Sequence, residues 1–244
     1  MNLILIFPNE WPQDAGKEAE VTLRDRRFDY IRSIHKPALG DSLRVGLIHG
    51  KIGLGKVMSL NEQHITLRVC LDELPPPPSP ATLVLALPRP PVLRRVLQAV
   101  TTFGVKDIYL VGSQRVEKSF WQSPALKEES IKEQLLLGME QARDTLTPNV
   151  HLRQRFKPFI EDELSSIVTN QPAFVAHPTP EATPFPNEIT EPSIIAIGPE
   201  GGFIPFEIEL LERIGFQARS LGSRILKVET AVSVVLGRCV NALA

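Results

Sequence analysis

The order of apolar and polar positions divides the chain into two parts that differ in the spacing of their apolar residues. The first part has short apolar or alternating segments, separated by turn residues such as Gly40-Asp41 and His49-Gly50. This pattern predicts strands at 3–7, 42–48, 52–58 and 64–71, and one helix near 22–33. Several short strands in so short a stretch favour a small β-barrel.

In the second part, apolar strands alternate with longer helical segments. The predicted strands are at 82–87, 107–111, 150–155, 173–176 and 193–197. The predicted helices are at 91–103, 124–145, 160–168, 205–214 and near 229–242. This alternation is typical of an α/β fold with a mostly parallel sheet that helices cover.

A proline-rich segment lies between the two parts. Residues 75–80 read Pro-Pro-Pro-Pro-Ser-Pro, which excludes a helix or a central strand and favours a stiff, extended polyproline conformation. The sequence therefore predicts a first domain at 1–74, a linker at 75–81 and a second domain at 82–244.

Composition narrows the class of protein. With 27 Lys+Arg against 28 Asp+Glu, the net charge is −1, so no overall basic field indicates a nucleic-acid partner. Cys70 and Cys239 cannot form a disulfide framework or a cysteine-rich metal site, which favours a reduced, cytoplasmic setting and no metal. No secretion signal and no uncharged apolar run of membrane-spanning length is evident, so no membrane partner is expected.

Residues 50–57 nearly match a phosphate-binding loop of the P-loop class. The position after Lys56 should be Ser or Thr, whose hydroxyl would hold Mg²⁺, but it is Val57. The segment also lies between two predicted strands, with no helix following the lysine. These departures favour a glycine-bearing hairpin.

A stronger candidate for a ligand site is Gly198-Pro199-Glu200-Gly201-Gly202, between strand 193–197 and helix 205–214. Ligands of α/β sheets bind at the carboxyl ends of strands, and glycines let backbone amides come close to them. The acidic Glu200 argues against a phosphate ligand. The alternative is a structural turn.

Two further segments add to this candidate. Residues 221–231, Leu-Gly-Ser-Arg-Ile-Leu-Lys-Val-Glu-Thr-Ala, place charged side chains directly before an apolar helix, where they are costly unless they are paired or functional. Ala176-His177-Pro178 ends strand 173–176. A capped helix start with solvated flanks and an ordinary loop histidine are the alternatives.

Together, the GPEGG and LGSRILKVETA segments resemble those of the RsmE family, and His177-Pro178 matches a further family position. Members of this family are SPOUT-class methyltransferases that modify N3 of a uridine in 16S ribosomal RNA. The resemblance implies a PUA-like RNA-binding domain, followed by a methyltransferase domain with a deep trefoil knot. It also implies S-adenosyl-L-methionine as cofactor, 16S ribosomal RNA or the assembled small subunit as partner, and a homodimer.

The resemblance also implies the site residues. Those expected to hold the cofactor are Ala176, His177, Ile197, Gly198, Pro199, Glu200, Gly201, Gly202, Leu221, Gly222, Ile225, Leu226, Thr230 and Ala231. Uridine N3 is a poor nucleophile until its proton leaves, so a base and a cation beside the flanking carbonyls would assist the reaction. Arg224 and Lys227 are the candidate cations, and Glu200 and Glu229 the candidate bases, with the choice between the two carboxylates open.

Basic residues also gather in local groups. The candidate RNA-binding side chains are Arg24, Arg26, Arg27, Arg32, Lys36, Arg89, Arg94 and Arg95. Five of these lie within 24–36 and three within 89–95. A third group, Arg153, Arg155 and Lys157, lies further along the chain. Each group alone is more often a solvated surface than an RNA contact.

Several positions depart from the family pattern, among them Ala99, Thr102, Lys227 and Val228. Lysine lacks the planar fork of the arginine that the family has at position 227. Two alternatives therefore stay open beside uridine methylation. One is a methyltransferase of the same class with another RNA target, and the other is a non-catalytic RNA-binding ribosome-assembly factor.

Overall fold

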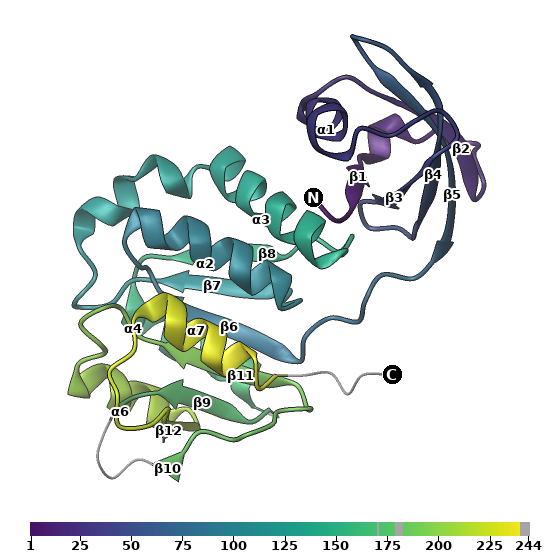
Figure 1. Ribbon diagram of the computed structural model, residues 1–244. Helices are drawn as coiled ribbons and strands as arrows, with labels where there is room; N and C mark the ends of the chain where they lie inside the picture. The colour runs from purple at the N-terminus through teal and green to yellow at the C-terminus, as the bar shows by residue number, and fades with distance from the viewer. Residues whose placement is uncertain (170, 179–182, 240–244) are drawn as a thin grey trace. The chain divides into compact units, whose positions relative to one another are not determined.

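The computed structural model describes residues 1–169, 171–178 and 183–239, and it divides into two compact units (Figure 1). The first comprises Met1–Pro76 and Leu136–Thr147, and the second Pro77–Leu135 and Pro148–Ala244. The sequence-based boundaries left 136–147 in the second domain, and this assignment needs correction. Met139 is fully buried with Leu3 and Leu5, so an apolar helix face joins this segment to the first unit.

The first unit contains a five-stranded sheet with the order β1-β3-β4-β5-β2. Its strands are β1 (Ile4–Ile6), β2 (Glu18–Leu23), β3 (Ser42–Leu47), β4 (Ile52–Leu60) and β5 (Ile65–Glu73). β1 pairs with β3 in parallel, and the other pairs are antiparallel. β1 and β2 are the two edges, and no ladder between them closes the sheet into a barrel within the part of the chain that the structure describes.

The short helices of the first unit are a 3₁₀ turn, η1 (Pro8–Glu10), then α1 (Arg26–Tyr30) and η2 (Ile31–His35). The predicted helix near 22–33 therefore starts too early. Polar and buried positions still alternate at the end of β2, which pairs with β5 as far as Leu23. The helix begins only after Asp25, whose carboxylate accepts a hydrogen bond from the backbone N–H of Arg27.

The glycine-bearing hairpin predicted for residues 50–57 is confirmed. Most of the segment belongs to β4, which pairs with β3 and β5. A Cβ atom at Gly53 would lie 1.8 Å from the carbonyl oxygen of Cys70. The glycine therefore serves close strand packing rather than phosphate binding.

The second unit is built on a seven-stranded sheet with the order β10-β12-β9-β11-β6-β7-β8, in which every pair is parallel. Its strands are β6 (Ala81–Ala86), β7 (Asp107–Val111), β8 (Asn149–Arg153), β9 (Ala173–Ala176), β10 (Thr183–Pro184), β11 (Ser193–Ile197) and β12 (Phe216–Ser220). The predicted α/β class with a parallel sheet is confirmed. Two strands were not predicted: β12, which has only one buried residue, and the two-residue β10.

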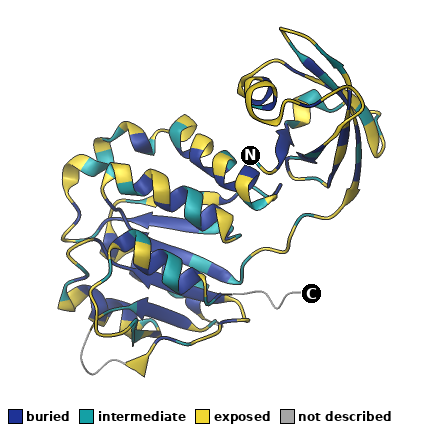
Figure 2. Cartoon of the chain, viewed as in Figure 1, coloured by how far each residue is buried: buried dark blue, intermediate teal, exposed yellow. Residues whose placement is uncertain are grey.

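The longer helices of the second part are α2 (Pro90–Thr102), α3 (Glu128–Ala142), α6 (Pro205–Arg213) and α7 (Val228–Leu236). Short ones are η3 (Lys118–Gln122), η4 (Pro124–Leu126), α4 (Phe156–Pro158), η5 (Phe159–Leu164) and α5 (Ser165–Val168). α2 and α7 pack against each other over the central strands (Figure 1). The strands are mostly buried, whereas the helices expose one side (Figure 2).

Two predicted helices differ from the observed ones. The segment predicted as a helix at 124–145 begins as a 3₁₀ turn and becomes α-helical only from Glu128. The final helix ends at Leu236 rather than near 242, because Gly237 follows it; residues 240–242 of that prediction lie outside the described residues. No helix in the described ranges is long and apolar enough to cross a membrane.

Candidate functional site

A pocket lies at the carboxyl ends of β9, β11 and β12, all in the second unit. Three loops and the start of α7 line it. The lining residues are Ala176, His177, Pro178, Ile197, Gly198, Pro199, Glu200, Gly202, Phe203, Leu221, Gly222, Arg224, Ile225, Leu226, Val228 and Ala231. The pocket encloses about 650 Å³ of empty space, part of it open to solvent, which is within the range of small-molecule sites.

The loop after β11 forms one wall of this pocket with backbone atoms. Gly202 has φ 72°, a left-handed conformation that favours glycine, and its N–H donates to the carbonyl oxygen of Pro199 over 2.8 Å. A Cβ atom at Gly198 would lie 3.0 Å from the backbone nitrogen of Phe203. Side chains at these two positions would therefore shift the wall.

Side chains from other segments hold the same loop in place. Glu200 accepts a hydrogen bond from the backbone N–H of Arg89 at 3.2 Å, and the guanidinium of Arg115 donates to the carbonyl oxygen of Gly201. The buried Glu207 accepts from the backbone N–H groups of Gln114 at 2.7 Å and Ile204 at 3.0 Å. The loop is thus fixed before any ligand binds, which lowers the entropy lost on binding.

The loops after β9 and β12 meet at His177. Its backbone N–H donates to the carbonyl oxygen of Arg219 over 3.0 Å, so the two strand ends stay paired at the pocket. Burial lowers the pKa of the His177 imidazole below its usual 6.5, and the opposing field of Glu212 only partly offsets this. The imidazole is therefore neutral at pH 7.

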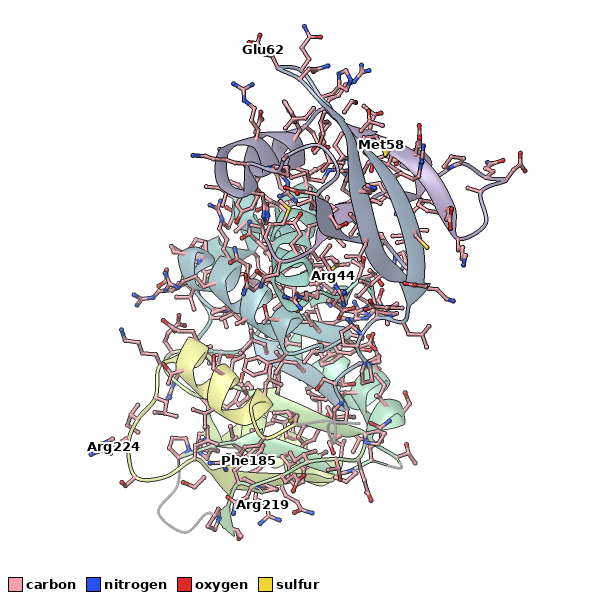
Figure 3. The ribbon with its side chains drawn as sticks, turned by 45° about the vertical axis from the view of Figure 1, so that its right-hand side comes forward. Arg44, Met58, Glu62, Phe185, Arg219 and Arg224 are labelled. Atoms are coloured by element: carbon pink, nitrogen blue, oxygen red, sulfur yellow. The ribbon has the colours of Figure 1, made fainter. Side chains whose placement is uncertain are left out.

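The third loop, between β12 and α7, combines an apolar lining with exposed ends. Ile225 is 80% exposed, while Val228 and Ala231 are buried at the start of α7. Arg224 lies on this loop, and its side chain points away from the body of the unit (Figure 3). Arg224 is also part of the pocket lining, so a ligand held by the three loops would lie within reach of a cation.

The structure brings most of the predicted cofactor residues together at this pocket, although Gly201 and Thr230 do not line it. Of the four candidate catalytic residues, Glu200 and Arg224 line the pocket. Lys227 is exposed at the residue before α7, and Glu229 pairs with Arg95 of α2 at 3.4 Å.

Pro178, which was expected near the site but not among the cofactor residues, also lines the pocket, and two further lining residues were not predicted. Phe203 directly follows the glycine-rich loop, and Val228 occupies the first position of α7. Both are buried, so the periodic spacing of apolar residues in the segments around them was the signal that could have identified them.

Several of the predicted RNA-binding arginines have partners within the fold, and one of them, Arg27, is buried. Arg27 is only 2% exposed; its guanidinium binds Asp25, Glu10 and the carbonyl oxygen of Leu5. Burial alone would lower the pKa of this guanidinium, but the bonds to the two carboxylates outweigh burial and raise it. Arg27 is therefore unavailable to RNA, which corrects that prediction.

Arg26 is partly engaged as well, because it forms a two-pronged ion pair with the buried Glu140 at 2.6 and 3.1 Å. Arg32 donates to the carbonyl oxygen of Glu62 over 3.2 Å. The remaining members of the set are exposed: Arg24, Lys36, Arg89, Arg94 and Arg95. These side chains keep the surface access that a phosphate contact needs.

Comparison with known proteins identifies the class of the second unit. The sequence profile of a family described as an RNA methyltransferase domain matches residues 75–240, which include all three pocket loops. The chain belongs to this family. Among curated members, the ribosomal RNA small subunit methyltransferase E of Treponema pallidum (strain Nichols) is 28% identical over 95% of this chain and 87% of that protein. The protein of the same name from Synechocystis sp. (strain ATCC 27184 / PCC 6803 / Kazusa) is 27% identical over 93% and 74%.

Solved structures of methyltransferases show the same fold. A ribosomal RNA small subunit methyltransferase E from Neisseria gonorrhoeae, bound to S-adenosyl methionine, matches with TM-score 0.75 and 18% identity over 97% of this chain and 95% of that one. A methyltransferase of Legionella pneumophila in complex with SAM matches with TM-score 0.72 and 21% identity over 97% and 96%. These likenesses establish that the chain has the α/β fold of these enzymes.

Proposed function

We propose that the protein transfers the methyl group of S-adenosyl-L-methionine to 16S ribosomal RNA of the small ribosomal subunit in the cytoplasm. The observation that carries this proposal is the pocket built by three loops at the carboxyl ends of β9, β11 and β12. The names of the relatives from Treponema pallidum and Synechocystis, and the SAM-bound relative from Neisseria gonorrhoeae, support it.

The pocket fits this cofactor in shape and chemistry. Apolar side chains such as Ile197, Leu226 and Val228 suit an adenine ring, and the glycine-rich backbone at Gly198 leaves amides accessible. When bound, the cofactor supplies a methyl group on a positively charged sulfur. A neutral His177 and the acidic Glu200 avoid repulsion of that charge.

The target atom that we propose is N3 of a uridine. Its proton lies between two carbonyl groups, and the nitrogen attacks the methyl group only as that proton leaves. Arg224 lines the pocket and would stabilise the negative charge that develops on the carbonyl oxygens. Glu200 lines the same pocket and would accept the proton. Catalytic roles for Lys227 and Glu229 stay predictions.

The proposal extends to the architecture around the pocket. We propose that the chain after β12 threads through the neighbouring loops as a trefoil knot, that the first unit is a PUA-like RNA-binding domain, and that two chains form a homodimer. Exposed apolar side chains at the pocket rim, above all Ile225, are consistent with a second chain that completes the site.

A methylation assay tests the proposal. The substrate is small ribosomal subunits from cells that lack this methylation, and mass spectrometry of the RNA locates the product. We expect N3-methyluridine with the wild-type protein, and calorimetry should show binding of S-adenosyl-L-methionine. A folded protein that binds no cofactor would overturn the enzymatic proposal, and a product at another atom would overturn only the target.

Two variants test the residue roles. Glu200→Gln keeps an oxygen that can accept from the N–H of Arg89 but cannot take a proton, so kcat should fall about 100-fold or more. Arg224→Ala should lower kcat by a similar factor through loss of charge stabilisation. The Kd for the cofactor should stay within about threefold of the wild type in Arg224→Ala, and it should rise in Glu200→Gln, which removes a negative charge from the pocket that holds the sulfonium. Unchanged kcat in either variant would exclude the role assigned to that residue.

A further inference from the structure

A second hollow lies beside the pocket, also entirely in the second unit. Its floor is formed by residues after β7 and β8, and its walls by η3, α4 and the start of α6. The lining residues are Gly112, Ser113, Gln114, Val116, Lys118, Trp121, Gln122, Gln154, Arg155, Phe156, Lys157, Ile204, Phe206 and Glu207. At Gly112, a Cβ atom would lie 2.0 Å from the carbonyl oxygen of Gln154, so only glycine allows the two strand ends to form this floor.

The hollow and the cofactor pocket share a wall. Phe203 lines the pocket and Phe156 lines the hollow, and their rings contact each other with centroids 5.5 Å apart. Ile204, the residue after Phe203, already faces the hollow. A polymer with one unit at the pocket can therefore place a neighbouring unit in the hollow.

The charges of the hollow favour an anionic occupant. Lys118 and Arg155 make no ion pair with any other described residue, and Lys157 has only a loose pair with Glu161 at 3.7 Å. The single carboxylate in the lining, Glu207, is buried and accepts backbone hydrogen bonds. Two free cations and a third weakly paired one thus face a hollow whose only acid is already engaged.

The neutral groups of the hollow suit a nucleobase. Phe206 is 48% exposed, and such an aromatic face allows any base to stack on it. The hydroxyl oxygen of Ser113 is buried without a hydrogen-bond partner among the residues that the structure describes. Gln122 and Gln154 add amide groups that can pair with base edges. A bound base would reach the two glutamine amides, which are exposed.

We propose that this hollow binds a single-stranded RNA nucleotide that neighbours the methylated one, with its phosphate at Lys118 and Arg155 and its base stacked on Phe206. This inference rests on the proposed function, because it assumes that the target nucleotide occupies the adjoining pocket. In this proposal, the hollow holds the RNA strand in register so that the target base reaches the cofactor.

The charge part of the proposal is tested with the full-length double variant Lys118→Ala/Arg155→Ala. Lys132→Ala is the matched control, because Lys132 is an exposed lysine of α3 that does not line the hollow. Binding to protein-free 16S ribosomal RNA and to unmethylated small subunits is measured over a range of salt concentrations. We expect about tenfold weaker RNA binding in the double variant, and a salt slope that falls by about 0.7 because the contacts to one phosphate of a single strand are lost.

The stacking part is tested at Phe206. Phe206→Leu should weaken RNA binding about fivefold or more, whereas Phe206→Tyr keeps the aromatic face and should restore it. Phe103→Leu, at a similarly exposed phenylalanine outside the hollow, is the control. All variants should bind S-adenosyl-L-methionine as the wild type does, which also shows that they fold.

The outcomes separate this inference from the proposed function. If the wild type binds cofactor and methylates RNA, and the double variant binds RNA as well as Lys132→Ala does, the hollow is not an RNA site although the function stands. Loss of binding to intact subunits but not to protein-free RNA would assign the hollow to a ribosomal protein and overturn the RNA assignment. If the wild type binds no cofactor, the proposed function fails, and the RNA measurements still decide the hollow.

Discussion

Motif-based prediction gave opposite outcomes in two regions of the molecule. One region is the pocket loops of the second unit, and the other is the basic segment at 24–36 of the first unit. At the pocket, residues selected by their backbone properties, such as Gly198 and Gly202, converge on one cavity. In the basic segment, residues selected by charge diverge, because Arg27 is buried and Arg26 pairs with Glu140 while Arg24 is exposed. A motif that constrains the backbone specifies its own geometry, whereas a charge is equally compatible with a partner inside the fold.

The largest effect should come from Arg27→Ala. It leaves the carboxylates of Glu10 and Asp25 without their shared cation and opens a space in the core of the first unit. Arg27 is buried, whereas Glu10 and Asp25 are 23% and 50% exposed and keep part of their hydration. Loss of the ion pairs and of the packing should therefore lower the free energy of unfolding by about 2 kcal/mol. Chemical denaturation followed by circular dichroism measures the change.

Arg24→Ala is the control for this prediction, because Arg24 is exposed two residues after β2 and should change stability by less than about 0.5 kcal/mol. The two substitutions should also differ in the opposite sense in RNA binding, where only the exposed arginine can contact phosphate. A stable Arg27→Ala protein with a reduced salt slope of RNA binding would reverse the comparison and restore Arg27 as an RNA contact.

The second effect tests the backbone-built pocket. In Gly198→Ala, the new Cβ atom would lie 3.0 Å from the backbone nitrogen of Phe203 and must move the loop. The affinity for S-adenosyl-L-methionine should fall about tenfold, which corresponds to ~1.4 kcal/mol of binding free energy. Calorimetry measures it, and Gly16→Ala, where a Cβ meets nothing within 4 Å, is the matched control.

An unchanged cofactor Kd in Gly198→Ala would mean that the pocket wall adapts to a side chain. The contrast between the pocket loops and the basic segment at 24–36 would then lose its basis. Equal loss in Gly16→Ala would instead indicate a general effect of glycine replacement. The expected pattern requires a selective loss at the pocket with both proteins folded.

The parallel sheet was predicted well because its central strands are short, continuous apolar runs. Such runs are typical of strands that are buried on both faces. Ser193–Ile197 is buried along its whole length, and its predicted bounds agree with the structure. β12 was missed because Phe216 is its only buried residue, so pairing with β9 rather than local pattern makes it a strand. A strand with so few buried residues depends on neighbours that a local reading of the sequence does not include.

The candidate site shows the same division. Loop residues around glycine and proline were predicted, because proline fixes its own φ and glycine admits backbone conformations that other residues avoid. Phe203 and Val228 were missed, since an apolar side chain at a pocket is indistinguishable in sequence from one in the core. The pairing of Glu229 with Arg95 was missed too, because 134 positions separate them and only the packing of α2 on α7 brings them together.

A smaller effect is expected from breaking that pair. In Arg95→Ala, an ion pair whose side chains are 64% and 31% exposed is lost, so stability should fall by less than about 1 kcal/mol. Thermal unfolding at low and high salt measures this, and the difference from wild type should shrink as salt screens the charges. Arg94→Ala, at an exposed neighbour that pairs with no residue in the part of the chain that the structure describes, should show no such salt effect. A loss of several kcal/mol would make the pair a structural element like the Arg27 network.

The smallest effect concerns the imidazole of His177, whose burial lowers its pKa below 6.5. On acidification the unfolded chain therefore takes up this proton before the folded one does, so the contribution of His177 to stability is complete above pH 6.5 and declines below it. An NMR titration should give a pKa below 6.5 for His177, and His177→Gln should reduce the loss of stability between pH 6.5 and the folded pKa. Because the pocket that buries His177 is held by backbone groups, its pKa should be the same in Arg224→Ala. A pKa at or above 6.5 would mean that this wall of the pocket is open to water, and the backbone would then hold the site less firmly than the pairing of His177 with Arg219 implies.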